Sequence, residues 1–162
     1  MAKTQRVHSE IQQLLDITDQ AFDRKSWHGT NLRGSLRGVS AEQAVWRPGA
    51  GRHNIWEEAI HAAYWKYAVW RRLTGSDRGS FPLEGSDWFT REEANESEWK
   101  ADLALLGRMH KSVREVIAAL RVNEIYSKPP GSKVSNFTLI SGIAAHDVYH
   151  AGQIQLLKRL RV

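Results

Sequence analysis

The sequence predicts an all-α protein: a four-helix bundle with one long crossover between its second and third helices. Four long segments carry apolar residues at three- and four-residue spacing, the period of an amphipathic helix. Segments with Gly and Pro separate them, and no stretch has the pattern of a strand. Four helices with one apolar stripe each cannot bury those stripes singly, so packing into a bundle satisfies them best.

The first predicted helix runs from Val7 to Phe22, where Ile11 and Leu14 belong to the apolar stripe. Residues 26–53 then form a structured connection that begins with a Gly-rich stretch. Within this connection, Ser40 is followed three residues later by Gln. This spacing is typical of a capping box and predicts a short helical turn before Pro48.

The second predicted helix begins after Asn54, an Asx cap, and ends near Leu73, before Gly75. Glu57 places an acidic side chain in its first turn, where the helix dipole favours negative charge. Residues 74–98 contain three glycines and one proline without a sustained helical period. We interpret this stretch as a long crossover rather than a tight turn.

The third predicted helix spans Trp99 to Leu120, with a seam of apolar positions four and three residues apart. A loop over residues 123–133 contains two prolines and a glycine, and the fourth predicted helix covers residues 137–160. The long crossover allows the second and third helices to run parallel, both antiparallel to the other two. Residues 1–162 are therefore expected to form a single domain.

The composition limits the chemistry and the partners. The chain has no Cys, which excludes disulfides, iron–sulfur clusters and a thiol nucleophile, so nitrogen or oxygen atoms must hold any metal. The sequence shows no signal peptide and no membrane span, so we expect a cytoplasmic protein without a membrane partner. The net charge is +5, but the cations are scattered and no nucleic-acid-binding motif accompanies them, so no nucleic acid partner is expected.

Three histidines form the candidate site. His146 and His150 are four residues apart on the predicted fourth helix, so their side chains share one face about 6 Å apart. Both lie on the apolar stripe. His61 lies beside the apolar stripe of the second helix, two turns from its start, and at a similar depth if the two helices are antiparallel. Spacing alone leaves two interpretations open: three hydrogen-bonded core histidines, or one divalent metal site with open coordination positions.

The segment HDVYHAGQI, together with one His on the second helix, resembles the DinB/YfiT-like superfamily of metal-dependent enzymes. The segments WHGTNLRGSL, VSAEQAVWRP and IWEEAIHAAYWKY also resemble DinB-like proteins, so the likeness covers nearly the whole chain. The resemblance implies a four-helix bundle with a crossover, nickel or zinc on the three histidines, and a homodimer. Some members transfer bacillithiol to electrophiles or isomerise maleylpyruvate with mycothiol, but a shared fold does not transfer the reaction.

Our primary hypothesis is a metal-dependent enzyme acting on a small molecule, either a thiol S-transferase or a hydrolase. An external low-molecular-weight thiol would be the co-substrate, because the chain has no Cys. The catalytic residues stay unassigned. The alternatives are a non-catalytic metal-binding or small-ligand-binding stress protein and a metal-free helical dimer.

Five further residues are weighed around the site. His28 either lines the substrate entrance or is an ordinary loop residue. Glu57 either orients a ligand ring or only complements the helix dipole. Tyr64 and Tyr149 either donate to an oxyanion at the site or pack at its rim. His110 is expected to be a core or boundary histidine rather than a fourth ligand, because nothing pairs with it at ligand spacing.

Overall fold

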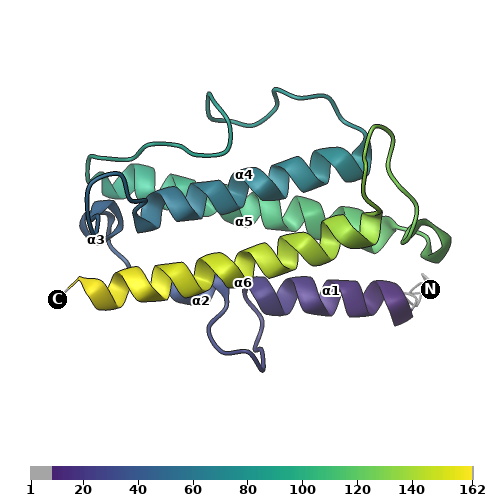
Figure 1. Cartoon of the computed structure of the whole chain (residues 1–162), viewed down its shortest axis with the longest axis horizontal. Helices are drawn as coiled ribbons and strands as arrows, with labels where there is room; N and C mark the ends of the chain where they lie inside the picture. Colours follow the sequence, from purple (N-terminus) through teal and green to yellow (C-terminus); the bar gives the residue numbers. More distant parts are fainter. Residues whose placement is uncertain (1–8, 162) are drawn as a thin grey trace, which may run out of the picture.

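The computed structural model describes residues 9–161, and these residues form helices and loops without a strand. The predicted all-α fold is thus confirmed for this part of the chain. Val7, the predicted start of the first helix, lies outside it. Four long helices lie side by side in Figure 1: α1 (Ser9–Phe22), α4 (Ile55–Thr74), α5 (Glu96–Ala119) and α6 (Asn136–Leu160). The shorter elements are α2 (Leu32–Leu36), α3 (Ala41–Val45) and a 3-10 turn (Val122–Glu124).

The helix α4 is enclosed on all sides. It runs in the same direction as α5 and opposite to α1 and α6 (Figure 1). The connection over residues 75–95 returns along the outer side of α4 before α5 begins (Figure 1). As a result, 13 of the 20 residues of α4 are buried. No helix within residues 9–161 is both long and apolar enough to cross a membrane.

The ends of α4 follow from local sequence signals. The Asn54 side chain accepts a hydrogen bond from the backbone N–H of Glu57, which satisfies one of the free amides of the first turn. At the other end, Gly75 adopts a φ of +70°, a left-handed conformation that costs Gly little. Both features were predicted from the sequence, and they determine the stretch of chain that carries His61.

Two other helix starts show the same local control. Ser40 and Gln43 form both hydrogen bonds of the capping box, and α3 follows as predicted. The helix α5 begins at Glu96, three residues before the predicted start. The reason is that the Asn95 side chain accepts hydrogen bonds from the backbone N–H groups of Ser97 and Glu98.

The core between α4 and α5 contains two fully buried tryptophans. Trp56 and Trp99 are 0% and 1% exposed, and their ring centroids lie 5.2 Å apart. The indole N–H of Trp56 donates to Asp102 Oδ2 at 2.7 Å, and that of Trp99 donates to the Val39 carbonyl at 2.8 Å. Because each polar N–H has a buried acceptor, the rings contribute their apolar area without an unsatisfied donor.

His110 is a core histidine, as predicted. Its ring stacks on Phe22 with the centroids 3.8 Å apart, and it is 6% exposed. Its Nε2 lies 3.5 Å from Asp19 Oδ1, but Arg114 Nε donates to both oxygens of that carboxylate, at 2.9 and 3.0 Å. Arg114 thereby neutralises the charge that would otherwise favour a protonated His110.

Acidification is expected to destabilise the protein partly through His110. Burial, helped by the positive charges of Lys66 and Arg114, lowers the pKa of His110 to about 3. The unfolded chain takes up this proton near pH 6.5. The contribution of His110 to the free energy of unfolding is therefore fully present above about pH 6.5. It is lost as the pH drops toward 3, by about 2 kcal/mol between pH 6.5 and 5.

Urea unfolding of chelator-treated protein at several pH values between 5 and 7.5 measures this loss. The His110→Gln variant should show a flatter pH dependence than the wild type by the same amount. An unchanged slope in the variant would contradict the assignment.

Candidate metal centre

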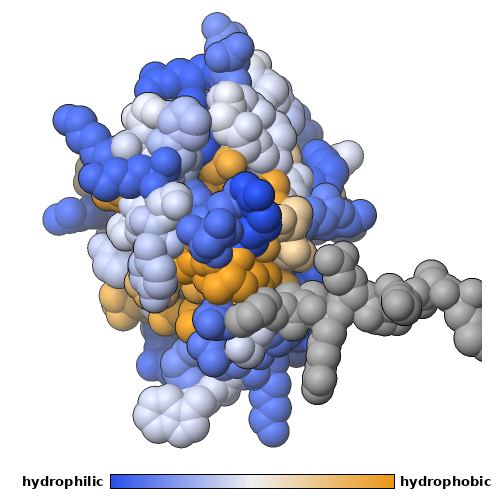
Figure 2. Space-filling model, turned by 90° about the vertical axis from the view of Figure 1, so that its right-hand side faces the viewer, coloured by the Kyte–Doolittle hydropathy of each residue, from blue (hydrophilic) through white to orange (hydrophobic). Residues whose placement is uncertain are grey.

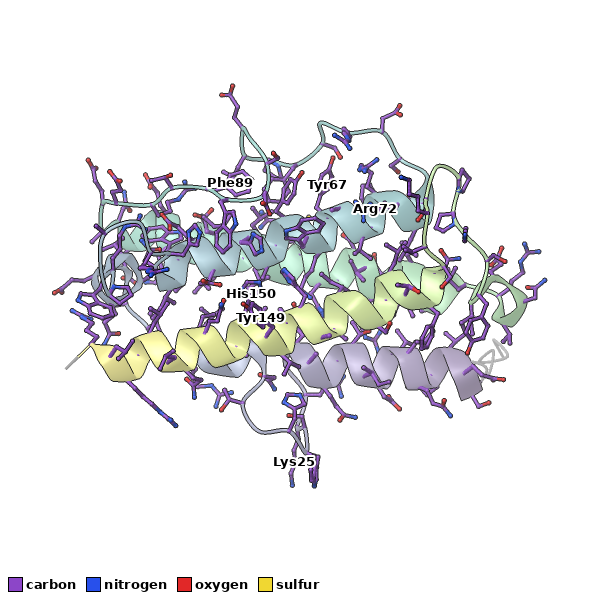
Figure 3. The ribbon with its side chains drawn as sticks, in the orientation of Figure 1. Lys25, Tyr67, Arg72, Phe89, Tyr149 and His150 are labelled. Atoms are coloured by element: carbon purple, nitrogen blue, oxygen red, sulfur yellow. The ribbon has the colours of Figure 1, made fainter. Side chains whose placement is uncertain are left out.

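Three histidine rings from two antiparallel helices meet between α4 and α6. His61 comes from α4, and His146 and His150 come from α6, where Figure 3 shows His150 between the two helices. The Nε2 atom of His146 lies 3.2 Å from Nε2 of His61 and 3.0 Å from Nε2 of His150. The three ligand atoms lie within 4.8 Å of one another, so the group could hold a metal ion.

Hydrogen bonds at Nδ1 determine which ring nitrogens face the group. Nδ1 of His61 lies 2.9 Å from the Asp87 carbonyl oxygen, which can only accept, so this nitrogen carries the proton. Nδ1 of His150 donates in the same way to Oε2 of Glu58. The Nε2 atoms of both rings therefore present lone pairs toward His146. Imidazoles oriented by a carbonyl and by a carboxylate are typical of metal ligands.

The spacing of the nitrogens fits a divalent ion. Zn–N bonds of about 2.0–2.1 Å place two nitrogens about 3.3 Å apart on a tetrahedral ion, and about 2.9 Å apart at right angles. Two of the three Nε2 pairs, His146 with His61 and His146 with His150, are separated by 3.2 and 3.0 Å and lie between these values. Without an ion, the lone pairs of His61 and His150 both face Nε2 of His146, which can carry one proton at most. The residues present thus fit a metal ion.

Burial also favours the neutral form of two of the rings, those of His61 and His146. Burial lowers the pKa of His61, and burial together with the neighbouring His150 and His61 lowers the pKa of His146 to about 3. Neutral imidazole is the form that binds a metal. Near neutral pH, these rings need not lose a proton before an ion binds.

The connection between α4 and α5 covers one side of His61. The Trp88 ring stacks on His61 at a centroid distance of 3.8 Å and on His53 at 3.5 Å. Asp87 has a φ of +65°, in the left-handed region that Asp tolerates better than most residues. In this conformation its carbonyl accepts from His61, and its Oδ1 accepts from the Trp65 indole N–H at 2.8 Å.

The ring-orienting contact, one of the two alternatives for Glu57, is made by its neighbour Glu58. Glu57 accepts hydrogen bonds from Arg47 and lies 3.1 Å from Nδ1 of His53, on the side of α4 away from the three rings. Glu58 instead faces His150 across the gap to α6. Consecutive residues differ by about 100° around a helix, and both glutamates suit the first turn of α4, so the sequence did not distinguish them.

Tyr149 lies beside the site and Tyr64 does not. Tyr149 is 63% exposed, with its ring 5.1 Å from that of His150. The Gln153 amide nitrogen donates to Glu58 Oε2 at 2.9 Å, and the amide oxygen of the same side chain accepts from the Tyr149 hydroxyl at 3.1 Å. Sequence reasoning did not identify Gln153, although it is one turn beyond Tyr149 on α6. Tyr64 packs against the connection, its ring 5.3 Å from that of Phe81.

His28 is not brought to the three rings. It is exposed in the loop of residues 23–31, where Figure 3 shows Lys25 projecting from the opposite side of the molecule to the α4–α5 connection. The candidate metal centre lies between α4 and α6, whereas this loop projects from the far side of the molecule.

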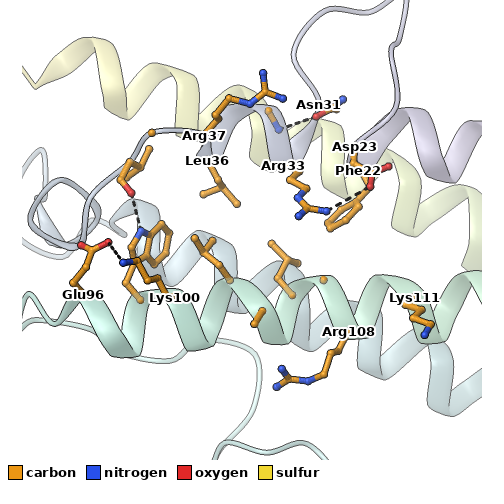
Figure 4. Close-up of a pocket in the computed structure, with 18 residues that line it drawn as sticks. Phe22, Asp23, Asn31, Arg33, Leu36, Arg37, Glu96, Lys100, Arg108 and Lys111 are labelled. Carbon is orange, nitrogen blue, oxygen red and sulfur yellow. Dashed lines mark hydrogen bonds and ion pairs between the residues drawn. The ribbon is translucent and has the colours of Figure 1, made fainter.

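A cavity of about 700 Å³ opens between α2 and α5, and none of the three histidines lines it (Figure 4). The buried rings of Phe22 and Trp99 line it together with the side chain of Leu36. At its rim, Arg33 lies 3.7 Å from Asp23 and Lys100 lies 3.9 Å from Glu96. This cavity is separate from the candidate metal centre.

A protein-family model covers most of the chain. The family model of the DinB superfamily matches residues 24–154, a range that contains the three histidines, Glu58 and Asp87. The chain belongs to the DinB superfamily. Searches of curated proteins and of solved structures find no match. This DinB-superfamily chain therefore carries a three-histidine group that could hold a metal ion.

In this DinB-superfamily protein, Glu58→Ala is expected to weaken binding of Zn²⁺ or Ni²⁺ by about 10–100-fold, because His150 loses the group that orients its ring. Glu57→Ala is the matched control, since Glu57 is equally buried but faces away from the rings. It should lower stability and leave the metal affinity unchanged. Competition with a chromophoric chelator measures both affinities. Equal losses in the two variants would refute an orienting contact by Glu58.

Proposed function

We propose that this protein is a metal-dependent enzyme that holds one divalent ion, nickel or zinc, on His61, His146 and His150. The observation that carries the proposal is the convergence of three Nε2 atoms while Asp87 and Glu58 accept the Nδ1 protons of two of the rings. The proposal includes a DinB-type four-helix bundle with a crossover, forming one domain over residues 1–162 that acts in the cytoplasm.

A bound ion would act as a Lewis acid and lower the pKa of a coordinated water or thiol. The chain's own residues prepare the site for this chemistry. Asp87 and Glu58 fix the orientation of two ligand rings, and the stacked Trp88 keeps water from one face of His61. Three protein ligands leave at least one coordination position for a small molecule, as in catalytic sites.

The proposed reaction is thiol S-transfer or hydrolysis. A low-molecular-weight thiol would come from solution, because the chain has no Cys. Tyr149 and Gln153 are the polar groups next to His150 that could contact a substrate, and no general acid or base is assigned.

Elemental analysis of natively purified protein, followed by a screen of thiols with electrophiles and of ester and amide substrates, tests this function. We expect about one ion per chain, and turnover that chelation removes and added metal restores. Protein that contains no metal and binds none on titration would refute the proposal.

The alternative is a non-catalytic metal-binding or small-ligand-binding stress protein. It is favoured by the placement of His61 on α4 and of the other two ligands on α6, because one ion would then link two helices. In this case, chelation should lower the melting temperature while the substrate screen shows no turnover. Loss of turnover without a change in melting temperature would favour the enzyme.

We also propose a homodimer that packs through the outward face of α6. The exposed positions between residues 142 and 156 carry no charge, and they include Tyr149 and Leu156, which are 63% and 57% exposed. An uncharged, partly apolar helix face is typical of a subunit interface. Sedimentation analysis of the wild type and of Leu156→Glu tests it, and a monomeric wild type would exclude it.

A further inference from the structure

A second cavity, of about 550 Å³, lies between the outer side of α4 and the connection that follows it. Trp65 and Asp87 are part of its wall, and both contact His61. The cavity therefore adjoins the metal centre on the Nδ1 side of His61, away from the three Nε2 atoms. Its volume is within the range of small-molecule sites, about 300–1,000 Å³.

Three arginines line this cavity, and none has a carboxylate partner within residues 9–161. They are Arg71 and Arg72, in the last turn of α4, and Arg78 in the connection. Among the described residues, the Arg71 guanidinium donates one hydrogen bond, to the Ser76 carbonyl at 3.5 Å. The Arg72 guanidinium lies 6.0 Å from the centre of the Trp65 ring. These cations are free to bind an anion.

Electrostatic stabilisation of the helix end does not account for the whole cluster. The helix dipole favours Arg71 and Arg72 at the C-terminus of α4, but Arg78 comes from the connection. A neighbouring cavity of about 540 Å³ shares all three arginines and adds Lys133 from the loop before α6, together with one acidic residue, Asp77. Hydrophilic residues predominate on this end of the molecule, around a smaller hydrophobic patch (Figure 2). Three separate segments thus bring positive charge to one place.

Two acidic residues line the cavity, and neither forms an ion pair with the arginines. Asp87 Oδ1 accepts the Trp65 indole N–H and lies 3.2 Å from Nδ1 of His61. Glu84 is exposed to solvent. The arginine end of the cavity therefore keeps its positive potential.

Hydrogen bonds hold the connection in place. The Tyr67 hydroxyl accepts from the backbone N–H groups of Gly79 and Ser80, at 3.1 and 3.2 Å. These bonds anchor the residues next to Arg78 against α4. Figure 3 shows Tyr67 and Arg72 on the side of α4 that faces the connection. The cluster is thus built from an anchored segment and a helix.

The other part of the cavity is aromatic. The rings of Tyr64 and Tyr67 each lie 5.3 Å from the Phe81 ring, and all three residues line the cavity. Aromatic rings prefer edge-to-face and offset contacts at such distances, so this wall suits a flat ring. The cavity combines this aromatic wall with arginine side chains at its edge. A guanidinium group is planar and can donate two parallel hydrogen bonds, so it suits phosphate and carboxylate groups.

We propose that this cavity binds a small molecule that consists of an aromatic ring bearing a phosphate or carboxylate group. The ring packs against Tyr64, Tyr67 and Phe81. The anionic group accepts hydrogen bonds from Arg71, Arg72 and Arg78. The site needs no metal ion, so its test is independent of the proposed enzymatic function.

Calorimetric titration of metal-free protein with phenyl phosphate, benzoate, inorganic phosphate and phenol tests the proposal. The first two distinguish a phosphate from a carboxylate ligand, and the last two measure the anion and the ring alone. We expect phenyl phosphate or benzoate to bind at least tenfold more tightly than inorganic phosphate and phenol. Two results would overturn the proposal. One is that inorganic phosphate binds as tightly as phenyl phosphate. The other is that neither aromatic anion binds at about 10 mM, a concentration at which even weak ligands bind.

Variants locate the ligand. Arg78→Ala is expected to weaken binding about tenfold, and Arg78→Lys should recover part of the loss because it keeps the charge. Arg108→Ala is the control, since Arg108 is an exposed cation on α5 that lines the other cavity. Thermal melting confirms that each variant is folded. Equal losses for Arg78→Ala and Arg108→Ala would show non-specific attraction by net charge and refute the site.

Discussion

Replacing Lys66 by Met is expected to lower the free energy of unfolding by about 3–5 kcal/mol. Lys66 and Asp147 are both 0% exposed, and Lys66 Nζ donates to Asp147 Oδ2 between α4 and α6. The Lys66 ammonium also lies 5.0 Å from the centre of the Phe22 ring. Without Lys66, the Asp147 carboxylate has lost its paired cation and, at 0% exposure, is not in contact with solvent. Either the carboxylate takes up a proton, or the helices separate.

Asp147→Leu should be similarly destabilising, because it leaves the Lys66 ammonium buried and unpaired. The double variant Lys66→Met and Asp147→Leu removes both charges and is expected to regain most of the loss. Denaturant unfolding of the four proteins, analysed as a double-mutant cycle, measures the coupling. Additive losses in the double variant would mean that the two charges do not depend on each other.

Replacing His61 by Ala is expected to reduce the affinity for Zn²⁺ or Ni²⁺ by about 10²–10⁴-fold. Structural zinc sites contribute about 10–16 kcal/mol in total, so one of three ligands accounts for about 3–5 kcal/mol. The remaining ligands, His146 and His150, lie on one helix, so they can hold an ion without linking α6 to α4. Loss of this link should also remove the increase in melting temperature that a bound ion produces.

His110→Gln is the control for the metal measurements. His110 is as buried as His61, at 6% exposure, but it lies among Phe22 and Asp19, outside the three-histidine group. Its metal affinity should equal that of the wild type. Wild-type affinity in His61→Ala, or an equal loss in His110→Gln, would show that the metal binds elsewhere.

Local interactions made much of the fold predictable. Asn54, Gly75 and the Ser40–Gln43 pair act within a few residues of themselves, so helix starts and ends could be located without a structure. The start of α5 at Glu96 was placed three residues late, because apolar spacing begins at Trp99 while the helix is started by the Asn95 cap. Periodicity indicates the buried face of a helix and not its first turn.

The candidate site was predictable only where its residues share a helix. The four-residue spacing of His146 and His150 places both rings on one face of α6 wherever that helix packs. The partner His61 depended on a depth estimate that holds for antiparallel helices, and α4 and α6 are antiparallel (Figure 1). The sequence by itself thus determined an all-α chain with a paired set of imidazoles and no thiol.

The tertiary structure alone decided what surrounds these rings. Glu58 rather than Glu57 faces α6, Lys66 meets Asp147, and Asp87 reaches His61 across 26 positions of sequence. The physical reason is the same in each case. α6 covers one side of α4 and the irregular connection covers another, so the polar residues of α4 are buried against distant partners rather than solvated, and no local period predicts which partner each residue meets.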